Sequence, residues 1–309
     1  MCGIERKANM KILNFGSLNV DYVYSLDHIV MGGETISSKE LNIFPGGKGL
    51  NQSVALARAG AQVYHAGCVG LDGQLLVDTL SGDGVDLTYL KTVDEKSGHA
   101  IIQVSADGEN SIVLYAGANH KISCEQVDSV LANFGKGDII VLQNEINNLE
   151  YIIDKAYEIG MQIIFNCAPI GNNVFSLDFS KISCVILNEI EMGAIAGCDD
   201  FEGGIAAMLE KNPDMKIMLT LGKKGCMYAD KNIRVSHPIF ETTVADTTAA
   251  GDTFTGYFVS EMAKGREVAD VLKVASCASA IAVSRHGASV SIPKYDEVMA
   301  ALNIMKIKE

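Results

Sequence analysis

Short apolar runs that alternate with amphipathic segments are the feature that most constrains the fold of this chain. The apolar runs have the length of strands, and they lie at residues 11–16, 61–70, 137–145, 161–167, 183–188 and 216–222. Segments with helical character lie between them, at residues 47–60, 73–84, 147–160 and 189–197. Parallel strands need crossover connections, and these cover both faces of a sheet. The pattern therefore predicts an α/β fold with a mostly parallel central sheet between helices.

Two stretches break this pattern and alternate with period two, which is typical of strands with one buried face. They are residues 20–45 and residues 97–117, and the second contains a turn at Ala106–Glu109. We expect them to form a small separate sheet, the lid. The apolar side chains expected on one of its faces are Val23, Ile36, Ile43, Ile101 and Val113. An apolar face needs cover, so we expect a homodimer that forms through the lid.

Composition narrows the class of protein. We expect residues 10–304 to form a single α/β domain and residues 1–9 to be an extension. The net charge of −13 argues against a nucleic-acid partner, which would need a basic surface to meet phosphates. The eight cysteines are scattered and include no C-x-x-C pair, so a zinc site is not expected. Without an apolar leader or a run long enough to span a membrane, a soluble, cytoplasmic protein is expected.

The segment VADTTAAGDTFTGYF (244–258) is the strongest local signal for chemistry. The small residues Ala250 and Gly251 stand where a loop turns into a helix, so backbone N–H groups could approach an anion closely. Asp252 would repel bound phosphate unless it takes a proton from an attacking hydroxyl. The alternative is that Asp252 merely caps the helix. The familiar G-x-x-x-x-G-K-[ST], G-x-G-x-x-G and G-x-S-x-G motifs are missing.

Two further segments offer polar groups to a polyhydroxyl ligand. In FPGGKGLNQ, Gly46 and Gly47 could expose backbone to a sugar, and Asn51 could both donate and accept hydrogen bonds. In GSLNVDYV, Asn19 and Asp21 follow the first strand and point the same way. A glycine-rich turn and a polar strand exit are the alternative interpretations.

Together GSLNVD, GGKGLNQ and DTTAAGDTF resemble the ribokinase-like (PfkB-type) sugar kinase family, and the GGKGxNQ form resembles its ribokinase branch. The resemblance extends from about Lys11 to about Pro293. It implies a ribokinase-like three-layer sandwich with a lid. It also implies an ATP-dependent sugar kinase that phosphorylates D-ribose to D-ribose 5-phosphate with Mg²⁺ and K⁺. Kinases of 2-deoxyribose, nucleosides or fructose, a sugar-binding protein without catalysis and a dehydrogenase are the alternatives.

The resemblance also assigns roles to residues. Asp252 matches the catalytic base, and Ala250 and Gly251 match the anion hole. The positions that match sugar contacts are Asn19, Asp21, Gly46, Gly47, Lys48, Asn51 and Glu145. Those that match nucleotide and magnesium contacts are Asn188, Glu191, Thr220, Gly222 and Gly225. Those that match a monovalent cation site, largely through backbone carbonyls, are Asp246, Thr248, Ala282, Arg285, Gly287 and Ser291.

The positions of three of these residues agree with their roles. Glu145, Asn188 and Thr220 lie at the carboxyl ends of predicted strands, where open α/β sheets bind ligands. Asn188 also fits the cap of a helix that has acids in its first turn. There are departures from the family pattern. His99 stands on a predicted lid strand, where it could touch the sugar. Ser276 stands where relatives carry a polar aromatic residue, and Ser289-Val290 replace a polar-proline pair.

Overall fold

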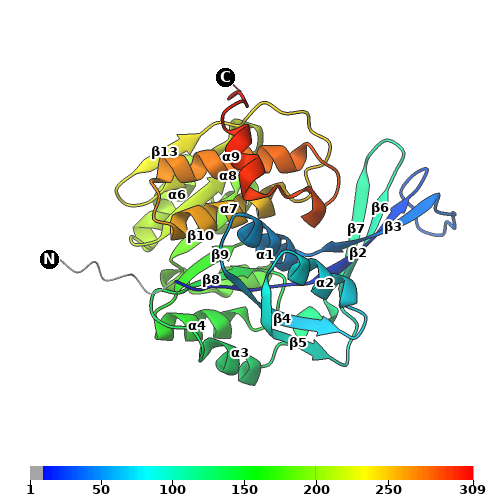
Figure 1. Ribbon diagram of the computed structural model, residues 1–309, viewed down its shortest axis with the longest axis horizontal. Coiled ribbons are helices and arrows are strands. Elements are labelled where there is room, and N and C mark those ends of the chain that lie inside the picture. The colour runs from blue at the N-terminus through cyan, green and yellow to red at the C-terminus, as the bar shows by residue number, and fades with distance from the viewer. Residues whose placement is uncertain (1–9, 199, 309) are drawn as a thin grey trace.

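A nine-stranded sheet forms the centre of the computed structural model, which describes residues 10–198 and 200–308 (Figure 1). Its strand order is β13-β12-β11-β10-β9-β8-β1-β4-β5. The strands are β1 (Ile12–Phe15), β4 (Val63–Gly70), β5 (Asp86–Val93), β8 (Ile139–Gln143), β9 (Gln162–Asn166), β10 (Cys184–Asn188), β11 (Lys216–Thr220), β12 (Cys226–Ala229) and β13 (Arg234–His237). All neighbours from β11 to β5 pair in parallel, as predicted.

Helices cover both faces of this sheet and complete three layers. One face packs against α1 (Lys48–Arg58), α2 (Gln74–Gly82), α7 (Ala250–Ala263), α8 (Val268–Val283) and α9 (Tyr295–Ala301). The other packs against α3 (Cys124–Leu131), α4 (Leu149–Ile159), α5 (Glu189–Ala196) and α6 (Phe201–Lys211). Along β1, Ile12 belongs to the first core and Leu13 to the second, because successive strand side chains point to opposite faces. The remaining helical turns are η1 (Gly117–His120), η2 (Asn172–Ser176), η3 (Phe179–Lys181), η4 (Gly222–Lys224) and η5 (Ser289–Ser291).

A second sheet projects from one end of the molecule (Figure 1). This lid sheet has the order β3-β2-β6-β7 and consists of β2 (Asn19–Ser25), β3 (Glu40–Gly46), β6 (Gly98–Val104) and β7 (Asn110–Tyr115). Strand β2 follows β1 after only three residues. The main sheet therefore fixes the base of the lid sheet, and the residues at this junction can reach the carboxyl ends of the parallel strands.

Pairing within the lid sheet corrects the face that we expected. Ile43, Ile101 and Val113 share a face with Tyr22, because these residues stand opposite one another across neighbouring strands. Val23 lies on the other face, since it pairs with Asn42 and Ile102. Ile36 lies before β3, which begins only at Glu40. Period two places alternate residues on one face, so Val23 could not share the face of Tyr22.

Some elements were not predicted from the sequence. Strands β12 and β13 form an antiparallel meander on the edge next to β11, and α3 and α6 were also missed. At the other end of the chain, Ile307 forms a bridge with Phe240, so the ordered fold continues past residue 304. The expected extension, residues 1–9, lies outside the described residues. Within the described part of the chain, no helix is both long and apolar enough to cross a membrane.

Candidate active site

Asp252 lies in the first turn of α7 and is only 5 % exposed. Its side chain is not the cap of this helix, which begins after Ala249 without a side-chain cap. The carboxylate instead accepts hydrogen bonds from Asn51 Nδ2 at 3.0 Å and from Gln52 Nε2 at 2.9 Å. Helix α1 therefore supplies both donors. A buried carboxylate held between two helices, with acceptor capacity on each oxygen, is suited to take a proton.

Beside Asp252, the start of α7 is open to a ligand. A Cβ added at Gly251 would meet nothing within 4 Å, so no protein atom blocks the approach to this turn. The first N–H groups of a helix lack acceptors within the helix, and the helix dipole favours negative charge there. The N–H of Ala250 already donates to the Thr247 carbonyl at 3.2 Å. The groups left for an anion are therefore the N–H groups of Gly251 and Asp252.

The junction of β1, β2 and β3 brings together the polar groups predicted for a sugar. Gly46 stands opposite Asn19 in the lid sheet, and a Cβ at Gly46 would lie 2.1 Å from Oδ2 of Asp21. Glycine is therefore required for the close approach of this carboxylate. Burial, followed by the charge of Glu145, raises the pKa of Asp21 to about 7. The next residue, Gly47, has a φ of +89°, a backbone conformation that favours glycine.

The Glu145 carboxylate is bound by backbone and side-chain donors next to this junction. The backbone N–H of Lys48 donates to Glu145 Oε2 at 3.0 Å, and the Ser17 hydroxyl donates to the same oxygen. Burial raises the pKa of Glu145. The charge of Asp252, and to a lesser extent those of Glu145 and Glu191, raises the pKa of Lys48. Lys48 therefore keeps its positive charge under the influence of Asp252, Glu145 and Glu191, and it could bind a further anionic group.

Asn51 completes the sugar side of the site. It is 5 % exposed, and its Oδ1 is buried without a hydrogen-bond partner among the described residues, while its Nδ2 donates to Asp252. An unpartnered buried acceptor costs roughly 1–3 kcal/mol, and a ligand hydroxyl that donates to it would remove that cost. Asn51 can therefore contact a sugar and the candidate base at the same time.

A pocket of 480 Å³ opens on the other side of the α7 N-terminus. Its lining includes six residues for which the resemblance implies nucleotide contacts, Asn188, Thr220, Gly222, Gly225, Ala250 and Gly251, and also Ser276. The walls are mostly apolar and come from Ile239, Phe240, Val244, Phe254, Ala280 and Val283. An elongated ligand with a flat apolar end could thus lie here with its anionic end at Gly251.

Asn188 and Glu191 form a capping box at the start of α5. The Glu191 N–H donates to Asn188 Oδ1 at 2.9 Å, and the Asn188 N–H donates to Glu191 Oε2 at 2.8 Å. The sequence interpretation of Asn188 as a cap is therefore confirmed. Burial raises the pKa of Glu191. The box fixes both side chains at the carboxyl end of β10, and Glu191 Oε1 takes no part in it.

The residues predicted for a monovalent cation come together around the loop that follows α8. Asp246 accepts hydrogen bonds from Thr248 N at 2.9 Å and from Gly287 N at 3.0 Å. Partial burial alone would raise the pKa of Asp246, but the hydrogen bonds that its carboxylate accepts lower the pKa. The Arg285 side chain pairs with Glu297, so only its backbone would be available to an ion. Among the described residues, no group of three His, Cys, Asp or Glu side chains is placed to hold a metal.

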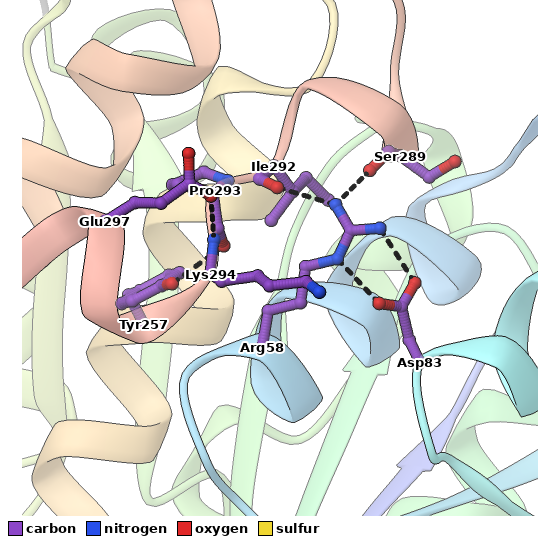
Figure 2. Close-up of polar contacts among 8 residues, drawn as sticks. All are labelled: Arg58, Asp83, Tyr257, Ser289, Ile292, Pro293, Lys294 and Glu297. Carbon is purple, nitrogen blue, oxygen red and sulfur yellow. Dashed lines mark hydrogen bonds and ion pairs between the residues drawn. The ribbon is translucent and has the colours of Figure 1, made fainter.

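Arg58, at the end of α1, fixes the segment that follows this loop (Figure 2). Its guanidinium pairs with both Asp83 oxygens, at 2.7 and 2.9 Å, and donates to the carbonyls of Ser289 and Ile292. The Tyr257 hydroxyl, on α7, donates to the Pro293 carbonyl at 2.8 Å. The helices that carry Asn51 and Asp252 thus also hold the segment from Ser289 to Pro293.

His99 does not face the sugar side of the lid sheet. It shares a face with Tyr22 and Tyr115, whose rings lie 6.0 and 5.0 Å from its own, whereas its neighbour Ala100 pairs with Asp21. The reason is the alternation of side chains along β6. A sugar contact from His99 is therefore not supported.

Sequence reasoning missed three neutral amides that orient the site. Asn119, on η1, holds Asn19, and Gln52 and Gln143 lie behind Asp252. The Gln of GGKGLNQ was quoted in the motif, but only Asn51 was singled out from it. Nothing in the local sequence marked Asn119 or Gln143, whose partners are 91 to 129 residues away in the chain.

The comparisons with known proteins agree with this geometry. The model of the pfkB family carbohydrate kinases matches residues 9–295. Ribokinase of Haemophilus influenzae is 33% identical over 299 residues, which cover 93% of this chain and 96% of that protein. The structure of Arabidopsis thaliana ribokinase complexed with ribose and ATP superposes with a TM-score of 0.84 at 29% identity, covering 96% of this chain and 100% of that one. Deoxyribokinase of Salmonella typhi is 28% identical over 96% of this chain and 99% of its own length.

Proposed function

The chain belongs to the pfkB family of carbohydrate kinases, and from this premise we propose that it phosphorylates D-ribose at its 5-hydroxyl with ATP. The observation that carries the proposal is the place of Asp252. It lies buried between Asn51 on the sugar side and the N-terminus of α7 on the side of the 480 Å³ pocket. A base at this point stands between a hydroxyl acceptor and a phosphoryl donor.

In the proposed reaction, the ribose 5-oxygen attacks the γ-phosphorus of ATP in line. A bond forms between these two atoms, and the bond from phosphorus to the β,γ-bridging oxygen breaks. The hydroxyl proton passes to the Asp252 carboxylate, and ADP leaves with the electron pair of the broken bond. The N–H groups of Gly251 and Asp252 donate to the oxygens of the transferring group, where charge is redistributed in the transition state.

Two metal ions are part of the proposal. Mg²⁺ would neutralise charge on the phosphates, and the oxygens of Asn188 and Glu191 would hold it through water, since carboxylate and amide oxygens suit this hard ion. K⁺ would be held by the Asp246 carboxylate and by backbone carbonyls from Ala282, in the last turn of α8, and from Arg285, Gly287 and Ser291 in the segment after it. The donor set fits, because all of these are hard oxygen ligands and the pKa of Asp246 is lowered, which keeps it ionised.

Ribose is preferred over its analogues because the pocket offers many polar partners. Asn19, Asp21, Asn51 and Glu145 present amide and carboxylate groups, and Gly47 is partly exposed. A site that is built to bond a hydroxyl rejects an analogue without it, since a buried polar group left unpaired costs about 1–3 kcal/mol. The ribokinase relatives at 33% identity support the same choice.

The test is steady-state kinetics of the purified protein with ATP and four acceptors: ribose, 2-deoxyribose, fructose and adenosine. We expect kcat/KM for ribose to exceed that for 2-deoxyribose by roughly tenfold or more, which corresponds to about 1.4 kcal/mol. Equal or better turnover of another acceptor would overturn the choice of ribose and leave the family unchanged. 2-Deoxyribose is the second candidate, because deoxyribokinases also match nearly the whole chain.

A further inference from the structure

A chain of buried neutral side chains continues inward from Asp252. It consists of Gln52, Gln143, Asn14, Ser53 and His65, each of which is 0% exposed. Asn14 and His65 stand opposite each other on β1 and β4, Gln143 ends β8, and Gln52 and Ser53 lie on α1. The chain therefore crosses the layer between the central sheet and α1, where apolar side chains otherwise pack.

The distances describe continuous hydrogen bonding. Gln52 Nε2 donates to Asp252 Oδ1 at 2.9 Å, and Gln143 Nε2 donates to Gln52 Oε1 at 2.8 Å. The same Gln143 nitrogen donates to Asn14 Oδ1 at 2.9 Å. Asn14 Nδ2 then donates to Ser53 Oγ at 2.8 Å, and Ser53 Oγ lies 2.8 Å from His65 Nδ1.

The carboxylate determines the direction of every bond in this chain. An ionised carboxylate only accepts, so Gln52 must turn its NH₂ toward Asp252 and its carbonyl toward Gln143. Gln143 must then turn its own NH₂ toward Gln52, which leaves its second hydrogen for Asn14. Ser53 accepts a hydrogen bond from Asn14 and so donates its own proton to His65. The Nδ1 atom of His65 must therefore carry no proton. Burial lowers the pKa of His65 to about 3, in agreement with that requirement.

We propose that Gln143 is a positioning residue for phosphoryl transfer: through Gln52 it holds Asp252 Oδ1, so that Oδ2 is the oxygen that takes the proton. The proposal rests on the proposed function of Asp252 as the base. Oδ2 is bonded to Asn51, the residue whose Oδ1 is unpartnered and suited to a sugar hydroxyl. A sugar that engages Asn51 therefore meets Oδ2, whereas Oδ1 faces the buried chain.

Gln143→Leu is the informative variant, because leucine has a similar size and cannot donate. Without the bond from Gln143, the amide of Gln52 is free to turn, and the Asp252 carboxylate loses a fixed donor. We expect kcat to fall by roughly tenfold, since a misplaced catalytic group loses part of a general-base contribution of about 10²–10⁴. The KM values for ribose and ATP should change by less than a factor of about two, because Gln143 contacts neither ligand.

Two readouts separate positioning from a merely structural role. A hydrogen bond to a carboxylate favours its ionised form, so the acid limb of the pH profile of kcat should move to higher pH in Gln143→Leu. In an Asp252→Asn background, the same substitution should leave the residual kcat unchanged, because its effect passes through Asp252.

The matched control is Ser260→Ala, on α7, which removes a buried hydroxyl bonded only to the Ala59 carbonyl. It should leave both kcat and the pH profile as they are.

The crystal structure of Gln143→Leu provides a readout that does not depend on the sugar. We expect the Gln52 amide and the Asp252 carboxylate to leave their present orientations. The positioning role is overturned if the carboxylate keeps both hydrogen bonds, or if kcat and the pH profile match those of the unchanged protein. Failure of the proposed function looks different: the unchanged protein would phosphorylate none of the four acceptors, and the crystal structure would still decide the role of Gln143.

Discussion

Asn119 donates a hydrogen bond from Nδ2 to Oδ1 of Asn19 over 2.8 Å. Asn119 is itself fixed, because its Oδ1 accepts from the backbone N–H of Leu18 at 2.9 Å. The amide of Asn19 thus has its carbonyl oxygen occupied and keeps its NH₂ as the donor for a ligand. One buried residue on η1 thereby determines the hydrogen-bonding character of a residue predicted to bind the sugar.

Asn119→Ala should raise KM for ribose by roughly tenfold and leave KM for ATP unchanged, because a lost donor in a polar pocket costs about 1–3 kcal/mol. Steady-state kinetics with each substrate varied in turn measures the effect. Asn133→Ala is the control, since Asn133 also donates to backbone carbonyls through Nδ2 but lies at an exposed position just after the end of α3. An equal rise of both KM values would mean that Asn119 supports the fold rather than the sugar site.

Asp252→Asn should keep the fold and reduce kcat by roughly 10²–10⁴, because asparagine has nearly the same shape but cannot accept the proton. Binding of ATP, measured by calorimetry, should be retained. A variant with more than about a tenth of the normal kcat would contradict the role of Asp252 as the base.

Asp21→Asn should make the sugar-free protein more stable than the unchanged protein, by an amount that grows between pH 4 and pH 7. Burial, together with the charge of Glu145, raises the pKa of Asp21 in the folded protein to about 7, against the ordinary value of 3.8 for an aspartate. Between these values the folded state binds more protons than the unfolded state, so ionisation of Asp21 lowers stability as the pH rises. Urea unfolding of both proteins across this range tests the sign, and parallel curves would show that Asp21 titrates normally.

Potassium should activate the enzyme without taking part in the chemical step, because an ion bound at Asp246 would fix the loop next to the start of α7. Initial rates in K⁺, Na⁺ and choline buffers at equal ionic strength are the measurement. Asp246→Asn should raise the K⁺ concentration needed for half-maximal activity. If the rate in choline equals the rate in K⁺, no cation site of consequence exists.

Dimerisation through the lid sheet is expected, because Ile43, Ile101 and Val113 are 50%, 40% and 59% exposed on one of its faces. Sedimentation velocity at micromolar concentration should give about twice the chain mass of 33.0 kDa. Ile101→Glu should shift the protein toward the monomer. Ile304→Glu, at a residue that is 80% exposed in the C-terminal segment, should leave the oligomeric state unchanged. A monomeric unchanged protein would contradict this prediction.

The main sheet could be predicted from the sequence because its strands are buried on both faces and therefore form continuous apolar runs. Strand β13 could not, because Arg234–His237 is short and only partly buried and shows no apolar run. Strand β12 is apolar and mostly buried but has only four residues, and it lies outside the repeating pattern of strands and helices. Helix α3 has a Ser123 cap and buried residues at Val127 and Val130, a signal present in the sequence but outside the repeating pattern.

The residues of the candidate site likewise fall into those that the sequence could predict and those that it could not. Residues in glycine-rich turns and at strand ends could be singled out locally, because the chemistry of these positions is unusual for loops. Gln143, which donates to Gln52 behind Asp252, and Asn119, the partner of Asn19, could not be singled out, since they are neutral amides whose function depends on tertiary contacts alone. The same limit applied to His99, whose face in the sheet depends on the pairing of β6 with β2.

The contacts of Arg58 also limit when the N-terminal part of the fold can be completed during synthesis. The two carbonyls that it binds lie 231 and 234 residues further along the chain. When α1 leaves the ribosome, Asp83 is the partner of Arg58 that is synthesised next. The carbonyls of Ser289 and Ile292 have not yet been synthesised at that point. A nascent chain that stops before Ser289 therefore cannot form the contacts that join α1 to the Ser289 and Ile292 carbonyls. The N-terminal third should reach its final stability only after the chain has been synthesised through Ile292.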